Sequence, residues 1–484
     1  MTRVRYWVLA GLIALVCAAM AALLLRPGAT TDLSRTQGST SGGDKVTIPA
    51  AAFDPHIVEI SAGADHTLAL GDDGRVFAWG NNADGQLGDG TTIARSQPVR
   101  VDTSGTPMDG AHIAQVSAGD YYSLALAEDG RVFSWGGNGF ATLGDGTQYD
   151  RPQPVEVHTG DADITQVAAG PEHALALTSD GKIFGWGKGG EGRLGPATDF
   201  ATTDPISIPA PAPMTHVAAS KNLSTALAGD GELYAWGFVP ADPDSDYGVL
   251  PVLEPTRIEG PELTGLARII RVGDGYGTSL LTDEGTLLEG TIRVSAELED
   301  DEGGHTITGG SFDVDHSREF IDLAAGDQYT LRLAPSGQVF ASGTNNLGGL
   351  GLTTEERVRD SRTGIDEPTV IPGLENIATI DAGANHSVAL TRTGSVLSWG
   401  VPTTYYRAEA TDDKKHRPEV VEFPGEKTVT EVFFGEASAG EFSIDRRGGI
   451  AARTPAHDAG EVDVRIVFDG GSQTVLEGAF TYTD

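Results

Sequence analysis

Few residues in this sequence have the types and spacing that catalysis or metal binding requires. Three histidines, His66, His173 and His386, could hold a zinc ion only if the fold brought them together. The sequence contains no H-E-x-x-H zinc motif and no G-x-x-x-x-G-K-[ST] phosphate loop. Its glycine-rich segments follow Trp-Gly pairs and do not join a strand to a helix. We therefore predict no catalytic activity, no metal and no cofactor.

One group of aspartates imitates the start of a calcium-binding loop. Asp242, Asp244 and Asp246 alternate as the oxygen ligands of such a loop do. However, Tyr247 stands where the loop needs glycine, and Glu254 comes one residue too late to close it. We expect a solvated loop here and no calcium site.

Loop residues of the types that anchor partners are better candidates for function. Aromatic rings offer large contact areas, and short polar side chains fix orientation. The candidates are Asp65, Asp120, Tyr121, Asp327, Gln328, Tyr405 and Tyr406. They predict binding of a protein or a cell-wall polymer. The alternative is a hydrolase or lyase that uses carboxylates around a central axis to cleave glycan or peptide.

Strong negative charge limits the possible partners. The chain has 33 Lys and Arg against 69 Asp and Glu, a formal net charge of −36. Nucleic-acid binding requires clustered basic side chains, whereas the basic run at residues 414–417 is short and is expected to be a solvated loop. The charge therefore argues against a nucleic-acid partner.

The elements that position the loops come from a repeated segment. The phrase IVEISAGADHTLALGDDGRVFAWG begins at Ile57 and returns six times with variations. The later copies begin at Ile113, Ile164, Thr215, Arg268, Ile321 and Ile377, at spacings of 56, 51, 51, 53, 53 and 56 residues.

Each copy predicts four antiparallel strands. Two alternating apolar stretches surround a turn such as Asp73-Gly74, which tolerates the positive φ of a type I′ hairpin. A strand before this hairpin and a short strand after the next Gly-rich loop complete the unit. Seven such units predict a seven-bladed β-propeller, because ring closure protects the sheet edges. We expect the strand at residues 46–48 to join the last blade and latch the ring.

Large rings recur at two positions of the repeat. One position holds Trp79, Trp135, Trp186, Trp236 and Trp399, where an indole can fill the gap between blades. The other holds His66, Tyr122, His173, Tyr329 and His386. A buried ring with a polar tip would bridge neighbouring blades at this position. A sevenfold arrangement would keep the three histidines apart.

An apolar N-terminal segment predicts a membrane anchor. Residues 6–25 are 20 consecutive apolar residues, enough for a helix of about 30 Å that spans a bilayer core. Arg3 and Arg5 precede it, so residues 1–5 are expected in the cytoplasm and the rest outside the cell. Cleavage at Ala19-Met20-Ala21 would instead give a secreted protein.

The pattern A-G-x-x-H-[ST]-L-A-L-x-x-D-G-x-V-[FY]-x-W-G-x-N-x-x-G-Q-L-G closely resembles the regulator of chromosome condensation repeat family, whose members form seven-bladed propellers. The resemblance covers residues 57–423. The fourth copy departs from it at Ser220 and Leu223, the fifth lacks Trp and His, and the sixth has Ser342 in place of Trp, so looser blades or altered loops are expected there. One family member is a nuclear guanine-nucleotide exchange factor that docks on nucleosomes, and others are secreted inhibitors of β-lactamases. An acidic, exported chain fits the second group better.

The tail resembles the later strands of the IPT/TIG immunoglobulin-like fold. The similar stretches are residues 432–435, 454–457, 460–464 and 480–482. The opening strands of that module are missing from the tail, so either the module is shortened or residues near Pro418 serve both parts.

The sequence thus predicts an all-β protein: a seven-bladed β-propeller with an N-terminal transmembrane helix and a small C-terminal immunoglobulin-like β segment. Its expected function is binding of an unknown extracellular protein or cell-wall polymer, as a single-pass membrane protein or, after cleavage, a secreted one. The predicted parts are a cytoplasmic end at 1–5, an anchor at 6–25, a flexible linker at 26–45, the propeller at 46–424 and the IPT/TIG-like segment at 425–484.

Overall fold

Two compact units make up the chain in a computed structural model. The larger unit comprises residues 57–391 and 395–423, and the smaller unit is built largely from the two ends of the chain. The structure describes residues 37–48, 57–196, 200–241, 249–260, 263, 266–272, 277–282, 287–298, 305–318, 320–344, 348–352, 365–400, 417–423, 429–444, 450–468 and 473–483.

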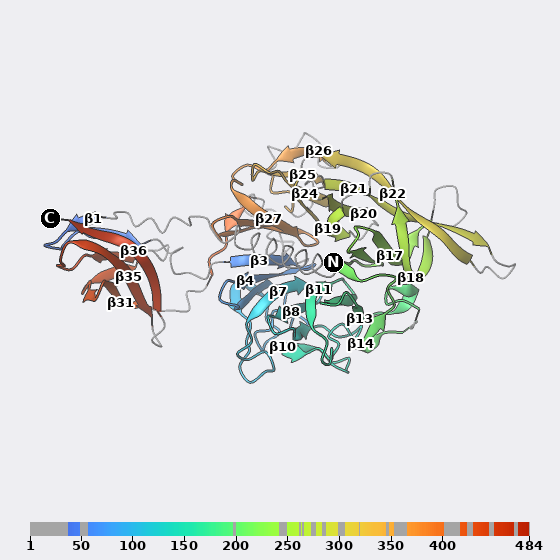
Figure 1. Cartoon of the computed structure of the whole chain (residues 1–484), viewed down its shortest axis with the longest axis horizontal. Coiled ribbons are helices and arrows are strands. Elements are labelled where there is room, and N and C mark those ends of the chain that lie inside the picture. The colour runs from blue at the N-terminus through green and yellow to red at the C-terminus, as the bar shows by residue number, and fades with distance from the viewer. Residues whose placement is uncertain are drawn as a thin grey trace, which may run out of the picture. The chain divides into compact units, whose positions relative to one another are not determined.

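The larger unit is a β-propeller with seven blades of four antiparallel strands around one axis (Figure 1), which confirms the predicted propeller. Blade one consists of β3 (Ile57–Ala62), β4 (His66–Gly71), β5 (Val76–Gly80) and β6 (Arg95–Arg100). Blade two is β7 (Ile113–Ala118), β8 (Tyr122–Ala127), β9 (Val132–Gly136) and β10 (Arg151–Glu156), and blade three is β11 (Ile164–Ala169), β12 (His173–Thr178), β13 (Ile183–Gly187) and β14 (Thr202–Ile208). Blade six is β23 (Asp322–Ala325), β24 (Tyr329–Leu333), β25 (Val339–Gly343) and β26 (Ile365–Val370), and blade seven is β27 (Ile377–Ala382), β28 (His386–Thr391), β29 (Val396–Gly400) and β30 (Glu419–Val420).

Burial explains the sequence pattern of a blade. The second strand is buried along its whole length, as in β4, because both of its faces pack against neighbouring blades. The outermost strand, such as β6, is mostly exposed. At the hairpin between β4 and β5, Gly74 has a φ of +76°, the left-handed conformation that the turn requires. Position in the blade therefore sets the apolar content of each strand.

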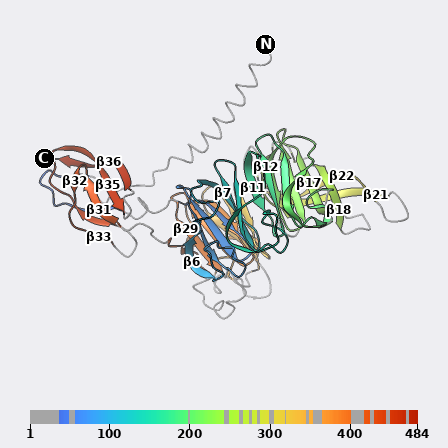
Figure 2. The same cartoon turned by 90° about the horizontal axis from the view of Figure 1, so that it is seen from below.

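Blades four and five form one continuous sheet. Blade four is β15 (Met214–Ala219), β16 (Leu223–Ala228), β17 (Leu233–Pro240) and β18 (Val249–Glu259), and blade five is β19 (Leu266–Val272), β20 (Gly277–Thr282), β21 (Leu287–Leu298) and β22 (His305–Arg318). Strands β18 and β22 pair in parallel through Ile258 with Gly310 and Glu259 with Ser311. The hairpin of β21 and β22 is longer than those of the other blades and extends beyond them (Figure 2). The degraded fifth repeat therefore still forms a blade, with altered outer strands.

Residues 46–48 do not join the last blade, so the prediction that they latch the ring is wrong. Those residues belong to β2 (Lys45–Ile48), which pairs with β34 (Ile450–Arg453) of the smaller unit. Blade seven instead takes β30 of its own repeat as its outer strand. Closure comes from contacts between blades seven and one, including the N–H of Ala384 donating to the carbonyl of Ala64 at 2.9 Å. The propeller accordingly begins at Ile57 and not at residue 46.

The smaller unit is a sandwich of two sheets. Its first sheet contains, in order, β1 (Gln37–Ser39), β36 (Gln473–Thr483), β35 (Gly460–Phe468), β31 (Val429–Phe434) and β32 (Ala437–Ser438). The second sheet contains β2, β34 and β33 (Phe442–Ile444). Both sheets contribute to one apolar core, in which Ile48 lies with Ile466 and Phe480. The likeness of this unit to the IPT/TIG module stays a prediction.

The N-terminal strands correct the predicted linker at 26–45. Strand β1 pairs in parallel with β36, from Gln37 with Thr481 to Ser39 with Thr483. These residues therefore supply strands that the tail itself lacks. The predicted anchor at 6–25 and the end at 1–5 lie outside the described residues, and within the described part no helix is long and apolar enough to cross a membrane.

We predict that Ile48→Asp unfolds the sandwich and leaves the propeller folded. The side chain of Ile48 is fully buried, so a carboxylate there should cost about 3 kcal/mol or more. The sandwich strands contain no tryptophan and five of the six tryptophans lie in the propeller, so with Trp7 replaced by Phe in both proteins, tryptophan fluorescence in a urea titration reports the propeller while far-ultraviolet circular dichroism reports both units. Loss of the cooperative fluorescence transition in the variant would show that β2 does support the ring.

Candidate functional site

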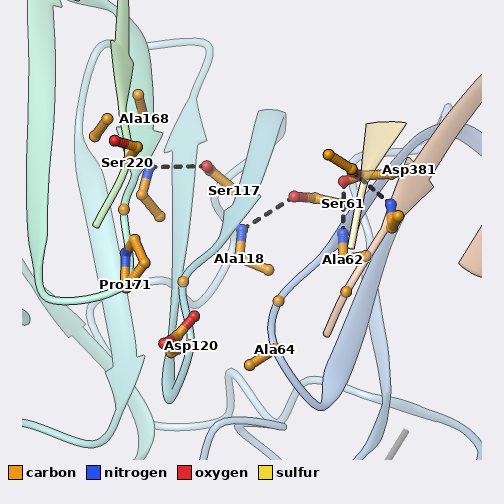
Figure 3. Close-up of a pocket in the computed structure, with 18 of the residues that line it drawn as sticks. Ser61, Ala62, Ala64, Ser117, Ala118, Asp120, Ala168, Pro171, Ser220 and Asp381 are labelled. Carbon is orange, nitrogen blue, oxygen red and sulfur yellow. Dashed lines mark hydrogen bonds between the residues drawn. The ribbon is translucent and has the colours of Figure 1, made fainter. Parts of the chain in front are cut away.

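A cavity of about 760 Å³ lies along the propeller axis. Residues from the inner strands of all seven blades line it, as do the loops that follow those strands. Figure 3 shows its wall: Ser61, Ser117 and Asp381 lie along the strands, while Asp120 and Pro171 lie in loops. The cavity therefore has a wall of strands and a mouth of loops.

Side-chain amides join the inner strands of blades two, three and four, which belong to separate sheets. Gln115 donates from Nε2 to the carbonyl of Val167 (3.0 Å) and accepts at Oε1 from the N–H of Val167 (2.9 Å). Gln166 makes the same two bonds with Val217, at 3.1 and 3.0 Å. Each amide thus satisfies both backbone groups of a residue in the next blade, as a strand partner would.

Carboxyl groups and hydroxyls make a similar contact at the junctions of blades one and two, two and three, six and seven, and seven and one, each accepting a hydrogen bond from a backbone N–H of the next blade. The pairs, acceptor first, are Glu59 with Val116 (3.0 Å), Asp322 with Ile380 (3.2 Å), Asp381 with Ala62 (2.7 Å), Ser61 with Ala118 (3.1 Å) and Ser117 with Ala169 (3.0 Å). We call these contacts, together with those of Gln115 and Gln166, the inner seam. The bond from Ala62 to Asp381 closes it between blades seven and one.

Glu59 stands where the next two blades have glutamine. Burial raises the pKa of Glu59 from 4.5 to about 8, against the lowering effect of its bond from Val116, and the nearby charge of Asp381 raises it further. The carboxyl is therefore protonated at neutral pH. A protonated carboxyl has one donor and one acceptor side by side, as the amides of Gln115 and Gln166 do.

A second layer of contacts is formed by the recurring histidines and tyrosines, which are buried and reach polar groups of the next blade. The contacts are His66 Nε2 with Ser123 Oγ (2.9 Å), Tyr122 Oη with the carbonyl of His173 (2.8 Å), His173 Nε2 with Ser224 Oγ (2.8 Å), Tyr329 Oη with Ser387 Oγ (2.9 Å) and His386 Nε2 with Thr67 Oγ1 (2.9 Å). Burial lowers the pKa of His66 and of His173 to about 3 and that of His386 to about 4. The rings are therefore neutral hydrogen-bonding groups near pH 7.

The recurring tryptophans lie against a loop of the preceding blade. Their indole N–H groups donate to backbone carbonyls there: Trp135 to Gln86 (2.9 Å), Trp186 to Thr142 (2.8 Å), Trp236 to Arg193 (2.9 Å) and Trp399 to Gly349 (2.8 Å). Gly88, with a φ of +68°, leaves room for Trp135, because a Cβ there would lie 2.8 Å from the indole nitrogen. Trp79 packs edge-to-face on Phe423, with ring centroids 6.0 Å apart.

Four of the predicted binding residues meet at the mouth of the cavity. Asp65, Asp120, Tyr121 and Asp327 all line it, and we call these four the channel-mouth surface. Gln328 lies beside it and accepts from the hydroxyl of Thr344 at 2.9 Å. The other two predicted residues, Tyr405 and Tyr406, lie outside the described residues.

The channel-mouth surface is negatively charged around an exposed ring. Burial and the charge of Asp327 raise the pKa of Asp65 to about 6. Burial raises the pKa of Tyr121, and the charges of Asp120 and Asp65 raise it further, although 48% of this residue is exposed. Such a surface favours cationic groups and offers them an aromatic face.

Sequence reasoning missed Phe140, which extends this surface outward. The N–H of Gly137 donates to the carbonyl of Tyr121 at 2.8 Å, which brings the loop of Phe140 to the same end of the blade. Phe140 is 41% exposed, and the ammonium of Lys188 lies 5.1 Å from its ring centroid. Phe140 takes the place that Asp84 has in the first repeat, so a comparison of the copies would have marked it.

The geometry offers no metal centre within the residues that the structure describes, where no three His, Cys, Asp or Glu side chains are grouped to hold an ion. His66, His173 and His386 each contact a different neighbouring blade. The three aspartates at 242, 244 and 246 fall outside the described ranges.

Comparison with known proteins assigns the family. The RCC1-like domain model matches residues 31–288, more than half of the chain, and the RCC1 repeat model matches residues 336–390. The chain therefore belongs to the RCC1-like domain family, as the sequence resemblance implied. Protein pim1 of Schizosaccharomyces pombe is 27% identical over 419 residues, which cover 80% of this chain and 67% of pim1.

Two further comparisons give similar coverage. The regulator of chromosome condensation of Mus musculus is 26% identical over 404 residues, covering 80% of this chain and 82% of that protein. The solved structure of Prp20p from Saccharomyces cerevisiae is 21% identical, covers 83% of each chain and has a TM-score of 0.44.

We predict that Glu59→Gln stabilises the propeller at alkaline pH. The folded carboxyl keeps its proton to about pH 8 and the unfolded one loses it near pH 4.5, so unfolding releases a proton between these values. The wild type should therefore lose up to about 1.4 kcal/mol per pH unit relative to Glu59→Gln as the pH rises from 5 to 8, and the difference should level off above pH 8. Urea unfolding from pH 5 to pH 9 measures it, and a difference independent of pH would contradict the protonated carboxyl.

Proposed function

We propose that this protein is a membrane-anchored, exported propeller that binds a protein or a cell-wall polymer through its channel-mouth surface and has no catalytic activity. The observation that carries the proposal is the exposed ring of Tyr121 at the mouth, beside Asp120 and Asp65. Exposed aromatic anchors on loops held by a rigid scaffold are typical of binding surfaces.

The cavity wall supports binding and not turnover. Gln115, Gln166 and Asp381 use their polar atoms to join blades. The buried histidines do not line the cavity, and their low pKa values keep them neutral and make them weak bases near pH 7, unsuited to acid or base catalysis.

Family membership supports an interaction role without naming the partner. One relative is named as a regulator of chromosome condensation. We do not transfer that role, because the net charge of −36 works against contact with nucleic acid. A partner with basic groups suits this chain better.

Export rests on the apolar segment at residues 6–25 and the two arginines before it. We predict that protease added to intact cells degrades the propeller of the full chain while a tag placed before Arg3 survives. Removal of the segment should leave the propeller protected inside the cell. Protection of the propeller in the unaltered chain would contradict export, and release of a shortened protein into the medium would indicate signal cleavage.

We predict that Tyr121→Ala weakens partner capture at least tenfold, because an anchor ring at the centre of an interface contributes about 2 kcal/mol or more. Crosslinking on intact cells followed by mass spectrometry identifies the partner, and a binding titration with the full chain measures the loss. The matched control is Glu128→Ala with Asp129→Ala, exposed residues in the hairpin turn at the other end of the same blade. Equal loss in the control, or unchanged capture by Tyr121→Ala, would count against the channel-mouth surface.

A further inference from the structure

Three large apolar side chains occupy equivalent positions in blades one to three. Ile93, Tyr149 and Phe200 each precede the first residue of an outer strand by two positions, and these strands begin at Arg95, Arg151 and Thr202. Their exposed fractions are 61%, 75% and 82%. Folding does not explain them, because an apolar side chain that stays in water adds nothing to the core. We call these three residues the rim row.

Hydrogen bonds between the blades connect the loops that carry the rim row. The N–H of Gly90 in blade one donates to the carbonyl of Pro152 in blade two at 3.0 Å, and the N–H of Gly146 donates to the carbonyl of Thr203 in blade three at 3.0 Å. The first bond joins the loop of Ile93 to the strand that follows Tyr149. The second joins the loop of Tyr149 to the strand that follows Phe200. The row therefore follows the edge of three adjacent blades.

The rim row lies at the same end of the blades as the channel-mouth surface. In blade one the carbonyl of Ile93 accepts from Asn82 Nδ2 at 3.1 Å, and the neighbouring Asn81 donates its N–H to the carbonyl of Asp65 at 2.8 Å. In blade two the N–H of Gly137 donates to the carbonyl of Tyr121 at 2.8 Å, so the loop of Phe140, which also leads to Tyr149, lies at the same end. One partner can therefore contact both.

The charges around the row are negative in sum. Arg95 and Arg151 are each paired with a carboxylate of their own loop, Asp89 at 2.7 Å and Asp145 at 2.9 Å, so their positive charges are largely compensated. Burial raises the pKa of Asp84 and the charge of the neighbouring Asp150 raises it further, which places two carboxyl groups close together between blades one and two. A basic partner would relieve this repulsion.

We infer that the rim row and the acidic surface beside it bind a protein segment that carries Lys or Arg between large apolar side chains. This inference rests on the proposed function and defines its partner class. Ile93 favours apolar side chains over sugar rings, because sugars stack on aromatic faces and isoleucine has none. The spacing of one member per blade suits an extended segment that crosses three blades, with apolar side chains on the row and basic side chains toward Asp84 and Asp150.

Three labelled peptides of 15 residues test the inference, with the full chain held in phosphatidylcholine nanodiscs. The first contains Lys and Leu or Phe in alternation, the second replaces the apolar residues by Ser, and the third replaces Lys by Glu. Fluorescence anisotropy should show the first peptide binding at least tenfold more tightly than either other peptide. The triple variant Ile93→Ser, Tyr149→Ser and Phe200→Ser should lose that preference while its thermal unfolding stays unchanged.

The matched control replaces three exposed valines elsewhere on the propeller, Val58→Ser, Val370→Ser and Val420→Ser, and should bind the first peptide as the wild type does. Equal binding of the three peptides, or an unaffected triple variant, would overturn the inference. Dimerisation in analytical ultracentrifugation that the triple variant abolishes would assign the row to a second copy of the chain and would also overturn it. Loss of the captured partner in Tyr121→Ala without any peptide preference would leave the proposed function standing and remove this inference alone.

Discussion

The propeller depends on hydrogen bonds from side chains of one inner strand to the backbone of the next. Inner strands of neighbouring blades lie in separate sheets at most junctions, so the blades cannot share a ladder there. Unpaired buried backbone groups cost about as much as a lost hydrogen bond, and the inner seam supplies partners for them. Gln115 and Gln166 replace a strand partner, and Asp381 does the same across the closing junction. Blades six, seven, one, two, three and four are therefore joined in that order by directional bonds as well as by apolar packing.

Much of this fold could be predicted from the sequence, because its main signal is local and repeated. The hairpin turns, the alternation of apolar residues and the recurring Trp-Gly pairs each lie within one copy of the repeat. The smaller unit could not be predicted in the same way. Its strand Gln37–Ser39 pairs with residues 481–483, and so distant a pairing leaves no mark on a short segment rich in Gly, Ser and Thr. For the same reason residues 46–48 were wrongly assigned to the last blade.

The candidate site was partly predictable as well. Asp65, Asp120 and Tyr121 follow directly after the inner strands, so the repeat itself places them at the mouth. Phe140 was missed because the family pattern allows any residue at its position, and the rim row because it lies in loops beyond the end of that pattern, which differ between copies. The carboxyl of Glu59 also stands out only when the copies are compared. At this inner-strand position the first blade has a glutamate where the second and third blades have a glutamine. The repeats thus predict the scaffold, and the differences between them carry the function.

The rigid ring of blades supports loops whose sequences differ between the repeats. Bonds between blades fix the loops of blades one to three relative to one another, so Tyr121, Phe140 and the rim row present a preformed surface that loses little conformational entropy on binding. The seam also keeps polar atoms of the cavity wall engaged, which leaves the loops as the part of the propeller that can vary without loss of the fold.

The propeller depends most on closure of the ring by side-chain bonds, and hydrogen exchange followed by mass spectrometry on the full chain tests this directly. The decisive amide is that of Ala62, which donates to Asp381 at 2.7 Å across the closing junction. We expect it to exchange as slowly as amides paired within blade one, and Asp381→Ala should accelerate it at least tenfold while the amides within the blade stay protected. Exchange of Ala62 in the unaltered chain at the rate of an exposed loop would contradict the account.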